Sequence, residues 1–179
     1  MKNLLLLRHA QALPADNGKD IDRTLSPKGL SDANILGETL KRKDTLPDRI
    51  LCSSAIRTHQ TCTQVLKALQ QQPHVELTKS VYDARFEDLL QMIKETDESC
   101  DTLMVIGHNP TIYEMAYKLA TQGNETALSN LSEGYPPASL SVIECETQNW
   151  NGLKPENCSI RLFITPLDYN APARPTRWT

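Results

Sequence analysis

The amino-acid sequence predicts an α/β protein, a three-layer α/β/α sandwich around a mostly parallel central sheet of about six strands. Two observations lead to this prediction. Over most of the chain, short apolar runs alternate with longer segments of helical periodicity, the order that buries a parallel sheet between two layers of helices. Two strand-like runs then close the pattern, joined by a polar loop that contains Asn151-Gly152. Such a pair favours an antiparallel hairpin at the end of the sheet.

The predicted strands are short and dense in apolar residues. The first contains Leu4, Leu5, Leu6 and Leu7 without a polar interruption, as expected of a strand buried on both faces. The expected strands are, in chain order, 3–7, 49–52, 74–78, 102–106, 139–145 and 159–165.

The first predicted helix follows a polar stretch over residues 11–24. Ser26-Pro27 has the character of an N-cap followed by proline in the first turn, and apolar residues then recur at helical spacing as far as Leu40. The remaining helices are expected over 55–71, 86–95 and 111–121.

Length and composition indicate one globular domain, expected over residues 1–169, followed by a loose tail over 170–179 that carries two prolines and two arginines. The 179 residues are 39% apolar and 23% charged, which excludes wholesale disorder. The net charge of −3 argues against a broad nucleic-acid-binding face.

A cytoplasmic location is expected. The apolar run from Leu4 to Leu7 is far shorter than the roughly 20 residues of a membrane span, and shorter than the apolar region of a signal peptide. The five cysteines form no CxxC pair and are expected to be free thiols in a reducing compartment. We therefore expect no membrane partner and no nucleic-acid partner.

Candidate functional residues follow the ends of four predicted strands. Because ligands of open α/β sheets bind beyond the carboxyl ends of the strands, these residues are expected to share one edge. They are Arg8 and His9 after the first strand, Ser53, Ser54 and Arg57 after the second, Tyr82 and Asp83 after the third, and Gly107, His108 and Asn109 after the fourth.

This set of side chains suits phosphoryl transfer. A neutral imidazole can attack phosphorus and form a covalent phosphohistidine, while guanidinium groups bind phosphate oxygens in pairs. A second imidazole, if protonated, would add charge where the transition state becomes negative, and a carboxylic acid could protonate the leaving oxygen. Nearby arginines should hold the pKa of the nucleophile low. No metal or cofactor is required.

Five segments in this order resemble the histidine phosphatase superfamily, the phosphoglycerate mutase-like enzymes, and most closely the small phosphohistidine phosphatases of the SixA type. The resemblance spans about residues 3–165, and the order and spacing of the segments make it specific. The segments are Leu7-Arg8-His9-Ala10, Arg23-Thr24-Leu25-Ser26 with Gly29, the stretch from Ser53 to Thr61, Ile106-Gly107-His108-Asn109-Pro110, and Pro136-Pro137-Ala138-Ser139-Leu140.

The resemblance implies a role for each matching residue. His9 would be the nucleophile, and Arg8, Arg57 and His108 would complete the phosphate pocket. Arg23 would contribute to substrate binding from the loop. Asp83 would be the proton donor, although some SixA-type members lack one, and a plain loop carboxylate is an almost equally good interpretation.

One residue departs from the family pattern. Ala10 stands where the family signature has glycine, which would be strained if that position needs a positive φ. SixA-like sequences often carry alanine there, so the substitution is interpreted as a mark of that branch.

Competing motifs are rejected on physical grounds. The stretch from Asp20 to Thr24 fits D-x-D-x-T, but it follows a turn rather than the apolar strand that would aim its first aspartate. Cys52 and Arg57 are separated by four residues, one fewer than the C-x5-R loop of cysteine phosphatases. His59 and His74 are interpreted as ordinary surface or strand-end histidines.

The sequence thus predicts a metal-independent phosphatase that acts through a phosphohistidine intermediate. The resemblance implies a phosphorylated protein partner, such as a phosphotransfer domain, as the substrate. Two alternatives remain open: a phosphatase of small phosphate esters, and a phosphate-binding protein of the same fold without catalysis.

Overall fold

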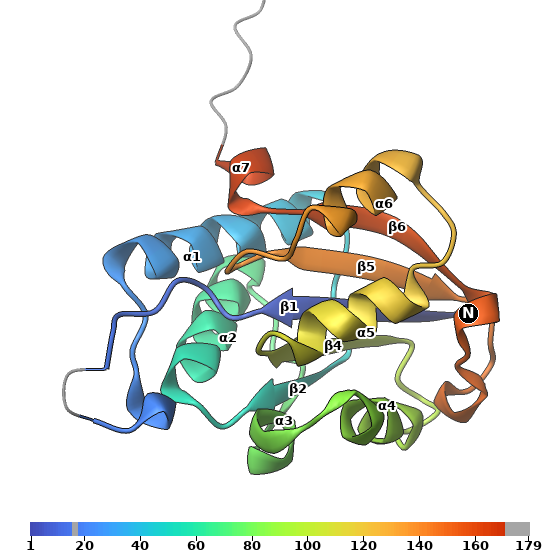
Figure 1. Ribbon diagram of the computed structural model, residues 1–179, viewed down its shortest axis with the longest axis horizontal. Coiled ribbons are helices and arrows are strands. Elements are labelled where there is room, and N and C mark those ends of the chain that lie inside the picture. Colours follow the sequence, from blue (N-terminus) through green and yellow to red (C-terminus); the bar gives the residue numbers. More distant parts are fainter. Residues whose placement is uncertain (16–17, 171–179) are drawn as a thin grey trace, which may run out of the picture.

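The computed structural model describes residues 1–15 and 18–170 and contains one six-stranded sheet in the order β3-β2-β4-β1-β5-β6 (Figure 1). Strands β3, β2, β4 and β1 run parallel to one another, whereas β5 is antiparallel to both β1 and β6. The mostly parallel sheet and its terminal antiparallel pair are as predicted. The strands are β1 (Lys2–Arg8), β2 (Arg49–Ser53), β3 (His74–Thr78), β4 (Thr102–Gly107), β5 (Leu140–Cys145) and β6 (Cys158–Ile164).

Helices cover both faces of the sheet, so the predicted three layers are present (Figure 1). Helices α1 and α2 enclose one apolar core, and α4, α5 and α6 enclose the other. The α-helices are α1 (Pro27–Arg42), α2 (Ile56–Leu69), α3 (Lys79–Asp83), α4 (Phe86–Lys94), α5 (Thr111–Leu119), α6 (Glu125–Ser132) and α7 (Pro166–Tyr169).

Strand β1 lies inside the sheet and contributes to both cores. Leu4 and Leu6 belong to the core beneath α4 and α5, whereas Leu5 and Leu7 belong to the core beneath α1 and α2. All four side chains are fully buried. Successive residues of a strand point to opposite faces, which is why the uninterrupted leucine run marks this position.

Three α-helices lie where the sequence predicts none, namely α3, α6 and the four-residue α7. The short α3 directly follows β3, with the Thr78 side chain accepting a hydrogen bond from the backbone N–H of Ser80. Helix α6 begins at the N-cap Asn124 and buries only Ala127 and Leu131. Five- and eight-residue helices with one or two buried positions are too short to produce a recognisable apolar period.

Two expectations concern the chain outside this core. Beyond Asn170, the loose tail predicted for 170–179 lies outside the described residues. In the described part of the chain, no helix is both long enough and apolar enough to cross a membrane.

Candidate active site

Three of the predicted site residues meet at one edge of the sheet. His9 directly follows β1, His108 directly follows β4, and Arg57 lies in the first turn of α2, after β2. Strands β2, β4 and β1 are neighbours, so their carboxyl ends lie side by side. The two imidazole rings are 5.1 Å apart between centroids, and the Arg57 guanidinium contacts both.

The hydrogen bonds of His9 identify its tautomer. Its Nδ1 lies 2.7 Å from the backbone carbonyl oxygen of Ala10, and because a carbonyl only accepts, Nδ1 carries the proton. The lone pair therefore lies on Nε2, which accepts a 3.3 Å hydrogen bond from Nε of Arg57. An imidazole held in this way presents Nε2 as its nucleophilic atom.

His108 is also neutral, but it is held as the other tautomer. Its Nδ1 accepts from Nη2 of Arg57 at 3.2 Å, and its Nε2 donates to the Ser53 hydroxyl at 2.8 Å. Arginine has no acceptor, so Nδ1 must be the unprotonated nitrogen. Ser53, at the end of β2, thus orients the second histidine.

Burial and positive charge keep both histidines neutral. Burial is the largest cause, with the charges of Arg57 and Arg8 adding to it; together they lower the pKa of His9 to about 4. The pKa of His108 falls to about 3, first by burial and then by repulsion from His9 and Arg57. The prediction that arginines lower the pKa of His9 has the right direction, but desolvation is the larger effect.

Arg57 is almost fully buried and all of its nitrogens are engaged. Besides the two histidines, its Nη1 donates to the backbone oxygen of Asp20 at 2.6 Å and its Nη2 to the Asp20 carboxylate at 2.9 Å. This planar set of donors is the feature that lets a guanidinium hold several oxygen atoms at once.

Asp20 is the residue that the sequence analysis did not assign to the site. It lies in a 3₁₀ turn, Asp20–Asp22, and its carboxylate also accepts from the Tyr82 hydroxyl at 3.0 Å and from Nη1 of Arg23 at 3.1 Å. Its sequence signals were the rejected D-x-D-x-T match and its position three residues before Arg23, the predicted substrate-binding arginine.

The other predicted residues occupy different positions. Arg8 donates to the backbone oxygen of Tyr135 at 2.7 Å, and its buried Nε has no hydrogen-bond partner within the described residues. Asn109 donates to the same oxygen at 3.0 Å. Arg23 reaches the site through Asp20, while its Nε donates to the backbone oxygen of Leu13.

Asp83 is not brought to the histidines. Its carboxylate is 60% exposed and faces Lys79 Nζ at 3.7 Å, and its described contacts include neither His9 nor His108. Neighbouring residues of a helix point about 100° apart. Within α3 it is therefore Tyr82 whose ring meets His108, edge to face, with 5.4 Å between centroids.

Ala10 fits its position without strain. Among the described residues other than glycine, a positive φ occurs at Asp44, Gln70 and Ala138, and Ala10 is not one of them. The Ala10 backbone N–H donates to the Thr61 hydroxyl at 3.0 Å, and the side chain is fully buried. Alanine is therefore tolerated where the family signature has glycine.

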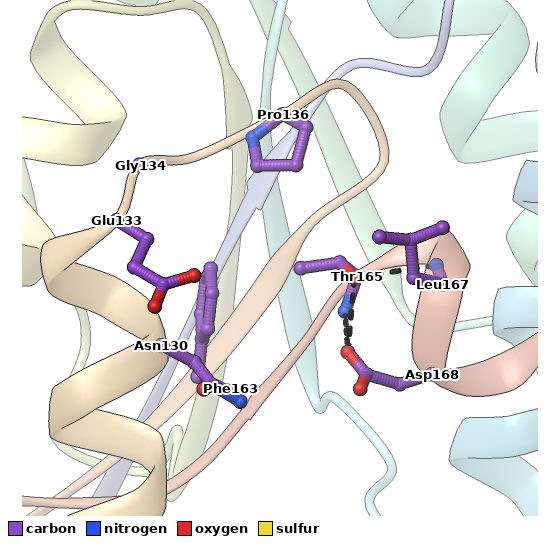
Figure 2. Close-up of a pocket in the computed structure, with 8 residues that line it drawn as sticks. All are labelled: Asn130, Glu133, Gly134, Pro136, Phe163, Thr165, Leu167 and Asp168. Carbon is purple, nitrogen blue, oxygen red and sulfur yellow. Dashed lines mark hydrogen bonds between the residues drawn. The ribbon is translucent and has the colours of Figure 1, made fainter.

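A cavity of about 310 Å³ lies next to this edge, between α6, the end of β6 and α7 (Figure 2). Phe163 lines it, and Glu133 and Asp168 contribute carboxylates. The Asp168 carboxylate is bonded to the backbone N–H and the hydroxyl of Thr165. Two carboxylates and no basic side chain in the lining make it unsuited to phosphate.

Across residues 1–15 and 18–170, no group of three His, Cys, Asp or Glu side chains is arranged to hold a metal ion.

The fold and the site define an α/β protein with a cluster of two histidines and a buried arginine at the carboxyl edge of its sheet. Residues 4–81 match the sequence model of the histidine phosphatase superfamily (branch 1). A solved structure of a candidate phosphohistidine phosphatase SixA from Nakamurella multipartitia has a TM-score of 0.79 at 26% identity, covering 93% of this chain and 96% of that one. The chain thus resembles the histidine phosphatase superfamily, in its sequence over residues 4–81 and in its fold over most of its length.

Two further proteins are similar to this chain. A candidate phosphohistidine phosphatase SixA from Agrobacterium tumefaciens has a TM-score of 0.77 at 28% identity, covering 92% of this chain and 98% of that one. An uncharacterised protein of Mycobacterium tuberculosis is 28% identical over 162 residues, 89% of this chain and 99% of the relative. The SixA-type resemblance is thus confirmed, and a phosphatase is the supported class of activity.

Proposed function

We propose that the protein is a phosphatase that transfers a phosphoryl group from phosphohistidine on a partner protein to Nε2 of His9, and from there to water. The observation that carries the proposal is the state of His9. Its Nδ1–H donates to the Ala10 carbonyl oxygen, and its Nε2 lone pair faces the Arg57 guanidinium. Because the pKa of His9 is low, the imidazole is neutral at neutral pH and Nε2 carries no proton.

The chemistry consists of two displacements. In the first, Nε2 of His9 bonds to phosphorus while the P–N bond of the substrate breaks. The phosphohistidine reacts in the form protonated on its other ring nitrogen, so the substrate imidazole leaves neutral, and the phosphorylated His9 carries the positive charge until the second displacement. In the second, water attacks phosphorus, the bond to Nε2 breaks, and the proton of the water passes to the phosphate released. Arg57 and Arg8 would stabilise the charge on the transferring oxygens.

Asp83 would have to change its position to serve as the proton donor. Its carboxylate pairs with Nζ of Lys79 at 3.7 Å, so it would have to leave that ion pair to protonate a leaving group beside the histidines. A leaving imidazole that already carries a proton needs no such donor, whereas an alkoxide leaving from a phosphate ester does. The position of Asp83 therefore favours phosphohistidine over small phosphate esters.

The test uses a phosphotransfer protein phosphorylated on histidine, with a chelator present. We expect the wild-type protein to release phosphate, and the His9→Ala variant to lose the activity by at least about 10³-fold, as expected for removal of a nucleophile. His59→Ala is the matched control, because His59 is exposed on α2 and should leave the rate unchanged.

Two results would contradict the proposal. Release of phosphate by His9→Ala at the wild-type rate would exclude His9 as the nucleophile. Inactivity of the wild-type protein on phosphohistidine would exclude the substrate, and a panel of small phosphate esters would then separate an ester phosphatase from a phosphate-binding protein without catalysis.

A further inference from the structure

The Asp20 carboxylate occupies the positively charged part of the pocket. One of its oxygens accepts from Nη2 of Arg57 at 2.9 Å and from the Tyr82 hydroxyl at 3.0 Å. The other accepts from Nη1 of Arg23 at 3.1 Å. Among the described residues, the only carboxylate that Arg57 contacts is therefore that of Asp20, in the 3₁₀ turn Asp20–Asp22.

A carboxylate and a phosphoryl group present similar pairs of oxygen acceptors to a guanidinium. Arg57 directs Nε to His9 and shares Nη2 between His108 and Asp20. A phosphoryl group bonded to Nε2 of His9 would bring its oxygens to these same donors. The carboxylate and the phosphoryl group would then compete for Arg57.

The two partners of the ion pair differ in how firmly they are held. The Arg57 side chain is only 6% exposed, whereas that of Asp20 is 53% exposed. Arg57 is also fixed by both histidines, which hold it at the base of the pocket. The carboxylate can therefore return to water while the guanidinium stays in place.

We propose that Asp20 is an internal anion that holds Arg57 in the free protein and is displaced by the phosphoryl group of the substrate. The inference rests on the proposed function, since it takes phosphate to be the ligand of Arg57. Displacement means that part of the binding free energy of the substrate is spent on separating Asp20 from Arg57. Asp20 thereby limits the affinity for phosphate, including the phosphate released as product.

Asp20 is ionised whenever this competition takes place. Partial burial raises the pKa of its carboxyl, but hydrogen bonds from Arg23, Tyr82 and Arg57 outweigh that effect and lower the pKa to about 2. The carboxylate therefore carries a full negative charge at neutral pH, and repels an incoming phosphate until it moves away.

The experiment measures the binding of inorganic phosphate by calorimetry at constant ionic strength. Asp20→Asn keeps the shape of the side chain and removes its charge, and we expect it to bind phosphate about 10-fold more tightly than the wild type, equivalent to about 1.4 kcal/mol. Asp22→Asn is the matched control, a second carboxylate of the same 3₁₀ turn, and should bind phosphate like the wild type.

A second variant tests the same inference without a substitution at Asp20, in case Asp20→Asn impairs folding. Tyr82→Phe removes one donor to the Asp20 carboxylate and keeps the aromatic ring beside His108, and should tighten phosphate binding about 2-fold. Equal or weaker phosphate binding by both Asp20→Asn and Tyr82→Phe would overturn the inference while leaving a wild-type phosphohistidine phosphatase intact. Absence of phosphate binding in the wild type and in every variant would overturn the proposed function as well.

Discussion

At the scale of single residues, the structure keeps two neighbouring imidazoles neutral beside a buried guanidinium. Burial is the main reason, and it acts on both rings in the same direction. A nucleophile needs its lone pair free, so the low pKa of His9 is suited to attack at neutral pH. The same desolvation makes the protein sensitive to acid.

The pH dependence of stability follows from these pKa values. In the unfolded chain, histidine titrates near 6.5, whereas in the folded protein His9 titrates near 4 and His108 near 3. Between about pH 6.5 and 4, the unfolded state binds more protons than the folded state, so the free energy of unfolding falls as the pH is lowered. Each histidine contributes up to about 1.4 kcal/mol per pH unit.

Denaturant unfolding in phosphate-free buffers between pH 4.5 and 7 measures this slope. We expect His108→Asn to lose about half of it, because one of the two depressed histidines is gone. His59→Ala removes an exposed histidine and should keep the wild-type slope. A wild-type stability that stays constant over this range would show that the histidines are not neutral in the folded protein.

The site residues differ in how well the sequence revealed them. His9, Arg57 and His108 could be predicted because each follows an apolar strand or begins the next helix, and neighbouring parallel strands bring such positions to one edge. Asp20 could not, because it contacts Arg57 from a non-periodic loop 37 residues away in the sequence. Asp83 does follow β3, in α3, but no sequence pattern showed that its carboxylate would pair with Lys79.

At the scale of elements, the close packing of α1 on α2 positions Arg57. Gly37 of α1 lies against α2, and a β-carbon added at Gly37 would be 2.5 Å from the backbone oxygen of Val65 and 2.7 Å from the β-carbon of Ala68. Backbone cannot give way as a flexible side chain can. The helices can therefore approach this closely only with glycine at that position.

Gly37→Ala should force α1 and α2 apart. Overpacking of a close contact typically costs about 1–3 kcal/mol, and we expect a loss of stability in this range despite the better helix propensity of alanine. Chemical denaturation is the measurement. Glu38→Ala, at the exposed neighbouring position, is the control and should change the stability by less than about 0.5 kcal/mol. Equal stabilities of the two variants would contradict the packing argument.

The longer elements could be predicted from the sequence because their apolar residues repeat with the period of the structure. Helix α1 combines such a period with the N-cap Ser26, whose side chain accepts a hydrogen bond from the Gly29 backbone N–H. The order of strands in space, with β1 between β4 and β5, comes from packing between distant segments. No local pattern in the sequence specifies it.

At the scale of the whole molecule, β1 connects the pocket with both cores. Its leucines pack alternately into the two cores, and His9 follows directly at its end. Arg57 similarly begins α2, which packs on α1 and on the sheet. A ligand that bridges His9, Arg57 and His108 would therefore connect elements that separate only when the molecule unfolds.

Phosphate should for this reason raise the melting temperature of the protein. A ligand at 100 times its dissociation constant adds about 2.7 kcal/mol to the free energy of unfolding, provided that it binds only the folded state. For a protein of this size, that corresponds to an increase of about 5–10 °C in melting temperature.

Phosphate is also excluded from protein surfaces and stabilises proteins without a specific site, so this increase in melting temperature needs a control. Arg57→Ala supplies it, because the variant retains the general effect and loses the residue that we propose as the main phosphate ligand. Calorimetric scans should show the full increase in melting temperature for the wild type and only a small part of it for Arg57→Ala. Equal increases in both proteins would mean that phosphate does not bind at this edge of the sheet.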